Sequence, residues 1–326
     1  MRFLPPLLTA LLLAYGFWPW LTGHSHPPRT LVISGFSIFG EVMTDGIVPA
    51  FERSWAEQTG ETIEAITSFA GSGTVTNQIR LGVPVEVTVL AHELDALRLA
   101  AAGIVTPAAW RSLPAQGVPI QTPIVLMVRP GNPLRLNTFT DLTRPGVRIV
   151  HADPLTSGGA LWGLLAEFAA FQRTSPNPGD ELARMWRNVA AQAGSARGAR
   201  TQFEQGFGDV LITYEQEAVR DLDLGRFEGE IIRPPGTIMA EPVVVPIARN
   251  IKPADDALVR AFTTFLWSDT AQQIFLRFGF RPIGGVPSGE EVRLPPVEAI
   301  TVAALGGWAE ANQQIIEREW KPRVRP

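Results

Sequence analysis

Short apolar runs alternate with longer amphipathic stretches along most of the chain. A short run of apolar or β-branched residues bounded by Gly, Pro or Ser predicts a buried strand, and apolar residues spaced three or four apart predict a helix. The predicted strands cover residues 30–34, 62–67, 85–90, 124–128, 147–150, 209–214, 231–233 and 242–246. The predicted helices cover residues 39–59, 93–102, 139–142, 160–172, 181–190, 215–221, 255–266, 270–278 and 297–319, and two more end near residues 81 and 205. Strands that alternate with helices predict an α/β fold with mostly parallel sheets flanked by helices.

Three of the predicted helices begin after turns rich in glycine and serine. These turns are Gly71-Ser72-Gly73, Ser157-Gly158-Gly159 and Gly194-Ser195-Ala196. A helix N-terminus leaves backbone N–H groups without partners, and the helix dipole adds partial positive charge, so such turns favour anions. One turn of this kind is most often an ordinary helix cap. Three of them lie at strand ends, where sheets of this type bind ligands, so an anion site is the alternative to three ordinary caps.

The side chains of these turns bear on which anion is bound. Sulfate carries no proton at neutral pH, so its site needs donors and no acceptor, whereas a site selective for monohydrogen phosphate also needs an acceptor such as a buried carboxylate. Arg197, just after the third turn, is the charged residue in these segments. Asp153, four residues before Ser157, is the candidate acceptor. The neutral turns therefore favour an unprotonated anion.

Two proline-containing segments, residues 121–123 and 240–242, are predicted to cross between two lobes. Proline ends local strand pairing, which suits a crossover. The first lobe then comprises residues 28–119 and 243–326, and the second comprises residues 120–242. Two lobes joined by short connections enclose a cleft that closes on a ligand by hinge motion.

The first 27 residues are predicted to be a secretory signal peptide or an uncleaved N-terminal anchor. Arg2 precedes the apolar run 3–21, which contains three prolines and is short for a membrane span. No cysteine follows it, so a lipid anchor on cysteine is excluded. We therefore expect an exported, periplasmic protein, tethered to the membrane if the segment stays uncleaved.

Composition removes several function classes. A net charge of −4 argues against nucleic-acid binding, and the absence of cysteine excludes thiolate metal sites and cysteine nucleophiles. Beyond the weak pair His24 and His26, the four histidines form no ligand spacing, so neither a metal nor a cofactor is expected. Ser72 lacks the glycine two residues before it that a serine-hydrolase nucleophile elbow requires, so no catalytic residue is assigned.

Nine short motifs, in this order and spacing, give the chain a family resemblance. They are Gly71-Ser-Gly73, Arg129-Pro-Gly-Asn-Pro133, Pro145-Gly-Val147, Asp153-Pro-Leu-Thr-Ser-Gly-Gly-Ala160, Ser195-Ala-Arg-Gly198, Gly208-Asp-Val-Leu-Ile-Thr-Tyr214-Glu-Gln-Glu-Ala218, Ala240-Glu-Pro242, Phe280-Arg-Pro282 and Gly306-Gly-Trp-Ala309. Over about residues 30–320 the chain resembles the periplasmic sulfate/thiosulfate-binding proteins of ABC importers. The resemblance implies a two-lobed type II periplasmic-binding fold with a ligand cleft between the lobes.

The resemblance also implies a set of ligand-binding residues. Carried over position by position, they are Ser37, Ser72, Ser157, Gly158, Gly159, Ala196 and Tyr214. Ser72 is expected to supply a hydroxyl and a backbone N–H, and Ser37, both glycines and Ala196 to supply N–H groups. The family commonly has aspartate at the position of Ser37, and Tyr214 replaces a tryptophan indole. Because a phenol can accept as well as donate, Tyr214 bears on selectivity.

The expected partners follow from the same resemblance. They are sulfate or thiosulfate and an ABC permease in the inner membrane, with the chain itself a monomer. Phosphate, molybdate or tungstate, and an organosulfonate remain alternative ligands, and a sensor domain or a serine hydrolase remains an alternative role. The acidic pair Glu215 and Glu217 is predicted to be a solvated face.

Overall fold

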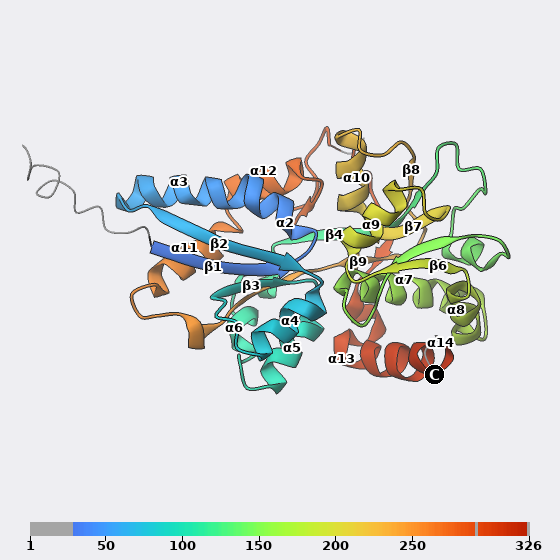
Figure 1. The fold of residues 1–326 in the computed structure, drawn as a ribbon, viewed down its shortest axis with the longest axis horizontal. Coiled ribbons are helices and arrows are strands. Elements are labelled where there is room, and N and C mark those ends of the chain that lie inside the picture. Colours follow the sequence, from blue (N-terminus) through green and yellow to red (C-terminus); the bar gives the residue numbers. More distant parts are fainter. Residues whose placement is uncertain (1–28, 291–292, 325–326) are drawn as a thin grey trace, which may run out of the picture.

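The computed structural model describes residues 29–290 and 293–324, which form two halves side by side along the long axis (Figure 1). The expected signal peptide or anchor at residues 1–27 lies outside the described residues. Within the described part, no helix combines the length and the apolar character that crossing a membrane requires.

The first half is built on a four-stranded sheet in the order β10-β3-β1-β2. Its strands are β1 (Arg29–Phe36), β2 (Ile63–Ala70), β3 (Val87–Leu90) and β10 (Val243–Pro246). The first three are parallel and β10 is antiparallel to β3. The helices of this half are α2 (Phe39–Val42), the π-helical η1 (Met43–Ile47), α3 (Val48–Thr59), α4 (Ser72–Arg80), α5 (Glu93–Ala101), α6 (Ala108–Arg111), η2 (Pro114–Gly117), η4 (Ala248–Asn250), α11 (Asp256–Phe265) and α12 (Asp269–Arg277).

The second half is built on a mixed sheet around β4, the long strand that leads out of the first half (Figure 1). Its strands are β4 (Ile120–Val128), β5 (Ile149–Ala152), β6 (Val189–Ala193), β7 (Val210–Tyr214), β8 (Glu230–Ile232), β9 (Thr237–Ala240), β11 (Arg281–Pro282) and β12 (Ala299–Ile300). Its helices are η3 (Phe139–Thr143), α7 (Gly158–Thr174), α8 (Pro178–Trp186), α9 (Ala196–Glu204) and α10 (Glu215–Asp223).

Strand direction in this second sheet differs from the prediction. β5 is parallel to β6 and β7, but β4 is antiparallel to each of β7, β8, β9 and β11. The prediction of a mostly parallel sheet therefore holds for the first half and is wrong for the second. An apolar run marks a buried strand without encoding the direction of its partners.

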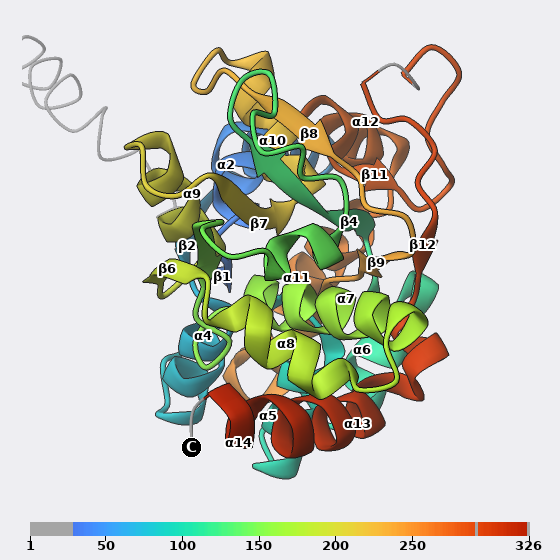
Figure 2. The same cartoon turned by 90° about the vertical axis from the view of Figure 1, so that its right-hand side faces the viewer.

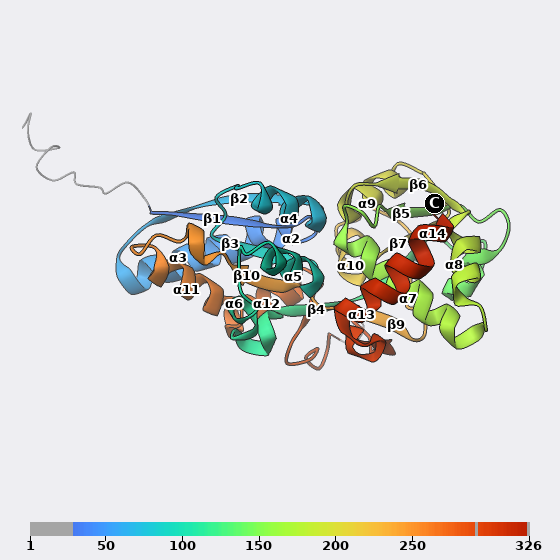
Figure 3. The ribbon, with the colours of Figure 1, turned by 90° about the horizontal axis from the view of Figure 1, so that it is seen from below.

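The C-terminal segment packs on the second half, although all of residues 243–326 were expected in the first lobe. It comprises η5 (Val302–Leu305), α13 (Gly307–Ala311), the π-helical η6 (Asn312–Trp320) and α14 (Lys321–Val324). β12 pairs with β9, η6 contacts both α7 and α8, and α14 contacts α8 (Figures 2 and 3). The buried Trp320 ring lies 5.3 Å from that of Trp186, centroid to centroid. This aromatic contact and the strand pairing account for the difference.

Candidate functional site

The two halves meet at the predicted glycine- and serine-rich turns. The Gly73 N–H donates to the Thr156 carbonyl oxygen at 3.1 Å, and the Trp162 indole N–H donates to the Ala91 carbonyl oxygen at 2.7 Å. A methyl group on Gly71 would lie 2.5 Å from the Thr156 oxygen and 2.6 Å from the Gly194 oxygen. Only glycine fits at position 71, because two loops of the second half lie against it there.

Two helices of the second half point capped N-termini at this contact. The Ser157 Oγ accepts from the Ala160 N–H at 3.4 Å at the start of α7, and the Ser195 Oγ accepts from the Gly198 N–H at 3.1 Å at the start of α9. Each cap satisfies the third N–H of its helix. The first two N–H groups of an α-helix have no acceptor within the helix, and in the described part of the chain those of Gly158, Gly159 and Ala196 donate to no other backbone oxygen either.

The predicted site residues come together at these helix ends. A methyl group on Gly158 would lie 3.0 Å from the Ser72 Cβ, and one on Gly159 would lie 2.7 Å from the Tyr214 Cε2 and 3.2 Å from the Ala196 Cβ. The residues expected to bind a ligand therefore lie together at the N-termini of α4, α7 and α9 and at the end of β7.

Ser37 is placed near Tyr214 by the residue before it, Phe36. Phe36, the last residue of β1, packs edge-on against Tyr214 with ring centroids 6.0 Å apart. Ser37 follows at once, in the turn before α2. The first half thus brings Ser37 and Ser72 to the residues that the second half supplies.

Tyr214 is fully buried, and its hydroxyl has no hydrogen-bond partner among the described residues. Burial raises the pKa of its phenol well above 10, and the negative charges of Glu217 and Asp95 raise it further. The phenol therefore keeps its proton and can donate a hydrogen bond into the site.

Ser72 contributes differently from what the resemblance implies. Its hydroxyl donates to the Asp95 Oδ2 at 2.6 Å and accepts from the Ala91 N–H at 3.0 Å. The hydroxyl expected to contact the ligand is therefore directed at a buried carboxylate of its own half. The Ser72 N–H, in the first turn of α4, keeps the role of a donor.

His92 is a further buried polar group that the sequence pattern does not single out. Its Nδ1 accepts from the Asp95 N–H at 3.3 Å, as the cap of α5, which places the ring proton on Nε2. Burial lowers its pKa, so the ring is neutral. The Nε2–H has no hydrogen-bond partner in the described part of the chain and would lie 3.1 Å from a methyl group on Gly158. The signal that could have found it is its position two residues after a buried strand, at a helix cap.

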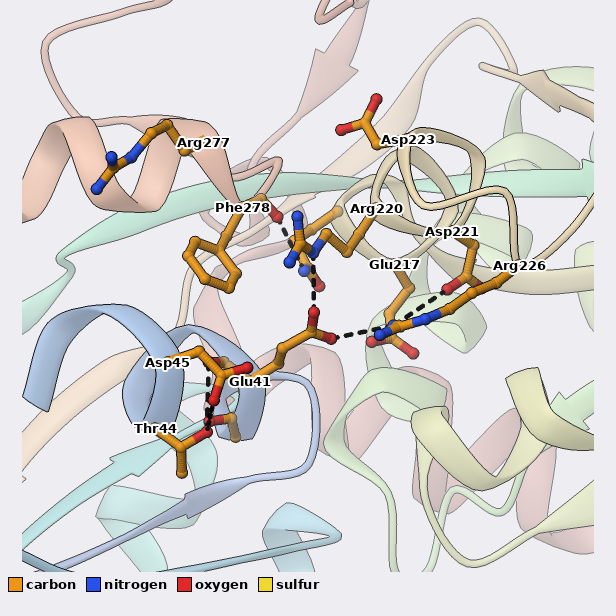
Figure 4. A network of polar contacts seen from close by, with 12 residues as sticks. Glu41, Thr44, Asp45, Glu217, Arg220, Asp221, Asp223, Arg226, Arg277 and Phe278 are labelled. Carbon is orange, nitrogen blue, oxygen red and sulfur yellow. Dashed lines mark hydrogen bonds and ion pairs between the residues drawn. The ribbon is translucent and has the colours of Figure 1, made fainter. Parts of the chain in front are cut away.

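A network of ion pairs links the halves beside the site (Figure 4). The carboxylate of Glu41, on α2, accepts from Arg220 at 2.9 Å and from Arg226 at 3.2 Å, and lies 3.8 Å from the Arg197 guanidinium. Arg197 also lies 3.5 Å from Glu217. Glu217 is buried, so the prediction of a solvated acidic face is wrong at this position. These pairs hold Arg197 among carboxylates.

The carboxyl of Asp221, in the same network, predicts a pH dependence of stability. Burial raises its pKa to about 7, against the opposing charge of Arg200 at 3.2 Å. A carboxyl with a raised folded-state pKa stabilises the fold fully below its unfolded pKa, and this contribution is lost as the pH rises through about 7. We compare the free energy of unfolding of Asp221→Asn with that of the wild type. We expect the variant to become more stable relative to the wild type by roughly 1–2 kcal/mol when the pH is raised from 5 to 8.

Urea denaturation at several pH values between 5 and 8 measures this difference. Asp223→Asn on the same helix, whose carboxylate is partly exposed beside Arg293, is the control and should give a nearly constant difference. A constant difference for Asp221→Asn would contradict the prediction.

Comparisons with known proteins agree with this geometry. The family model of bacterial extracellular solute-binding proteins matches residues 39–281. A sulfate-binding protein of Synechococcus elongatus is 31% identical over 93% of this chain and 89% of its own length, and a thiosulfate-binding protein of Pseudomonas aeruginosa is 31% identical over 85% and 84%. The solved sulfate-binding protein SubI of Mycobacterium tuberculosis matches with a TM-score of 0.78 and 30% identity, covering 88% of this chain and 99% of its own.

These relatives are named for binding and not for catalysis, and the two-lobed type II periplasmic-binding fold expected from the sequence is confirmed. The length of the match and the order of the turns that meet between the halves lead to one assignment. The chain belongs to the sulfate/thiosulfate-binding proteins, within the family of bacterial extracellular solute-binding proteins.

Proposed function

We propose that this protein binds a tetrahedral oxyanion, sulfate or thiosulfate, in a cleft between its two halves. The observation that carries the proposal is that Gly159, in the first turn of α7, lies against both Tyr214 and Ala196, the first residue of α9, and that the Tyr214 hydroxyl has no hydrogen-bond partner among the described residues. Hydrogen-bond donors aimed at one point, with the positive ends of two helices behind them, suit a dianion without a counter-ion.

The donor count is sufficient for useful affinity. The backbone N–H groups of Ser37 and Ser72 from the first half join those of the second half. The Ser157 hydroxyl also keeps its proton for the anion, because its oxygen is the acceptor in the cap with Ala160. A hydrogen bond to a charged group contributes about 1.5–3 kcal/mol. After the dianion is desolvated, a net binding free energy near −8 kcal/mol would correspond to about micromolar affinity.

This chemistry fits a receptor that delivers its ligand to an ABC permease in the inner membrane. The protein would act as a periplasmic monomer without catalytic activity, exported by its N-terminal segment. The alternative role is a sensor domain with the same fold. Genes for a permease and an ATPase beside that of this protein would favour transport.

A titration series tests the ligand and the site together. We expect isothermal titration with sulfate to show one site, and Ser157→Ala to weaken it about tenfold, because one hydrogen bond to the anion is lost. Ser268→Ala is the matched control, because Ser268 caps α12 in the same way, away from the site. It should lose the same kind of cap and keep wild-type affinity. Absence of heat with both sulfate and thiosulfate would contradict the proposal.

A second candidate ligand class rests on Tyr214. A phenol can accept a hydrogen bond where the family's indole cannot, so phosphate, which carries a proton, is the alternative that Tyr214 favours. Molybdate, tungstate and an organosulfonate stay open because Tyr214 and Ser37 both depart from the family's residues at these positions. Titration with these anions decides between them. Heat with phosphate and none with sulfate would establish the alternative.

A further inference from the structure

The three parallel strands of the first half end at one edge of its sheet, and each is followed by a polar residue. β1 lies between β2 and β3, and all three point toward the second half (Figure 1). Ser37 is the first residue after β1, and Ser72 is the second residue after β2. His92 is the second residue after β3. Since ligands of such sheets bind at the carboxyl ends of the strands, His92 has the same relation to the site as the two serines.

The imidazole ring of His92 is held in one orientation. Its Nδ1 accepts from the Asp95 N–H at 3.3 Å, and its ring packs on those of Trp308 and Trp162 with centroid distances of 4.4 Å and 6.4 Å. Because Nδ1 accepts, the proton of the neutral ring is on Nε2. This N–H is therefore a donor of fixed direction.

The Nε2–H of His92 is buried and has no acceptor among the described residues. The Asp95 Oδ2 lies 3.7 Å away, too far for a hydrogen bond, and it already receives the Ser72 hydroxyl at 2.6 Å. A buried donor without a partner costs about 1–3 kcal/mol of stability. A ligand that accepted this hydrogen bond would remove that cost.

The unpartnered donor lies beside the first turn of α7. The His92 Nε2 would be 3.1 Å from a methyl group on Gly158, and the Ser72 Cβ would be 3.0 Å from the same methyl group. Neither the Gly158 N–H nor the Ser72 N–H donates to another backbone oxygen in the described part of the chain. The imidazole N–H and these two backbone donors therefore lie around one position, where the two halves meet.

We propose that His92 is a further ligand-binding residue of this site and donates its Nε2–H to an oxygen of the bound oxyanion. This inference rests on the proposed function and deepens it by adding a side-chain donor from the third strand. A neutral N–H donates to an oxyanion that carries no proton, so the role suits sulfate and thiosulfate. Because the Ser72 hydroxyl is engaged by Asp95, His92 supplies the side-chain donor that the resemblance implied for Ser72.

Two substitutions of His92 separate the donor from the helix cap. In His92→Asn, the side-chain oxygen can take the place of Nδ1 and keep the cap of α5, but the side chain is too short to reach the position of Nε2. In His92→Gln, the amide nitrogen can reach the position of Nε2, and the cap is lost. Isothermal titration with sulfate and with thiosulfate should show affinity weakened about tenfold or more in His92→Asn and within about threefold of the wild type in His92→Gln.

This order of affinities distinguishes ligand contact from a structural role. Both variants lose the aromatic packing on Trp308, and His92→Gln also loses the cap, so thermal unfolding should show it to be the less stable of the two. If His92 only supported the fold, His92→Gln would lose at least as much affinity as His92→Asn. That result, or wild-type affinity in His92→Asn, would overturn the proposal.

Nuclear magnetic resonance of the wild type with isotope-labelled histidine tests the contact without any variant. We expect the Nε2–H signal of His92 to shift downfield at saturating sulfate. His151 is the internal control, because its ring nitrogens already contact the Ala152 carbonyl oxygen at 2.6 Å and the Glu167 carboxylate at 2.9 Å, and its signals should stay in place. An unchanged His92 signal while sulfate binds would also overturn the proposal. Failure of the wild type to bind either sulfate or thiosulfate would instead refute the proposed function.

Discussion

Replacing Gly158 with alanine is expected to weaken sulfate binding about 100-fold or more. The added methyl group would lie 2.4 Å from the Ala91 Cβ and 3.0 Å from the Ser72 Cβ, both in the first half. Carbon atoms cannot approach to 2.4 Å, so the halves would have to stay apart. The N–H groups at the start of α7 would then miss an anion held by Ser37 and Ser72. Isothermal titration measures the loss, and small-angle scattering at saturating sulfate should show a larger radius of gyration than for the wild type.

Two further variants make this prediction specific. Gly194→Ala adds a methyl group in the neighbouring turn, where the nearest atom is the Thr156 Oγ1 at 3.8 Å, an ordinary contact distance. It should bind within about threefold of the wild type. Ala91→Gly combined with Gly158→Ala removes the closest opposing atom and should recover part of the affinity. A Gly158→Ala protein that binds as tightly as the wild type would show that the ligated state does not bring α7 against Ala91.

The parts of the fold that the sequence predicts are those written in local patterns. Residues 39–59 were predicted as one helix, and the structure has a continuous helical run from Phe39 to Thr59 with a π-helical turn inside it. β6 was missed because its sequence, Val189 to Ala193, is rich in alanine, a good helix former, and its strand conformation comes from pairing with β5. β12 was likewise predicted as the start of a long helix, and it is a strand through its pairing with β9.

The site divides in the same way. Ser157 and the two glycines after it form a pattern that is typical of a capped helix N-terminus. This pattern spans only a few residues, so it was enough to predict the start of the helix. The partner of Ser72 is Asp95, 23 residues further on. The burial of Glu215 depends on Arg281, 66 residues away. No local pattern encodes such pairs, and Glu215 was accordingly predicted on a solvated face, which is wrong.

Glu215→Gln is expected to lower the free energy of unfolding by about 3–5 kcal/mol. The Glu215 side chain is fully buried at the start of α10. Its carboxylate receives the Arg281 guanidinium through Nε at 2.6 Å and Nη2 at 2.9 Å, and Arg233 Nε at 2.5 Å. Glutamine keeps the shape but removes the charge, and it leaves two arginines, one of them buried, without a counter-ion.

The location of Arg281 makes this the largest expected effect of a single charge on stability. Arg281 lies on β11, which pairs with β4 at Gln121, where the chain passes from the first half to the second. Losing the ion pair therefore loosens the connection between the halves as well as α10. Urea denaturation measures the change, with Glu298→Gln as the matched control, because Glu298 pairs with Arg173 at an exposed position and should cost less than about 1 kcal/mol. Equal losses in the two variants would show that Glu215 is compensated by other groups, whereas recovery of stability in Glu215→Gln/Arg281→Met would identify the uncompensated guanidinium as the cause.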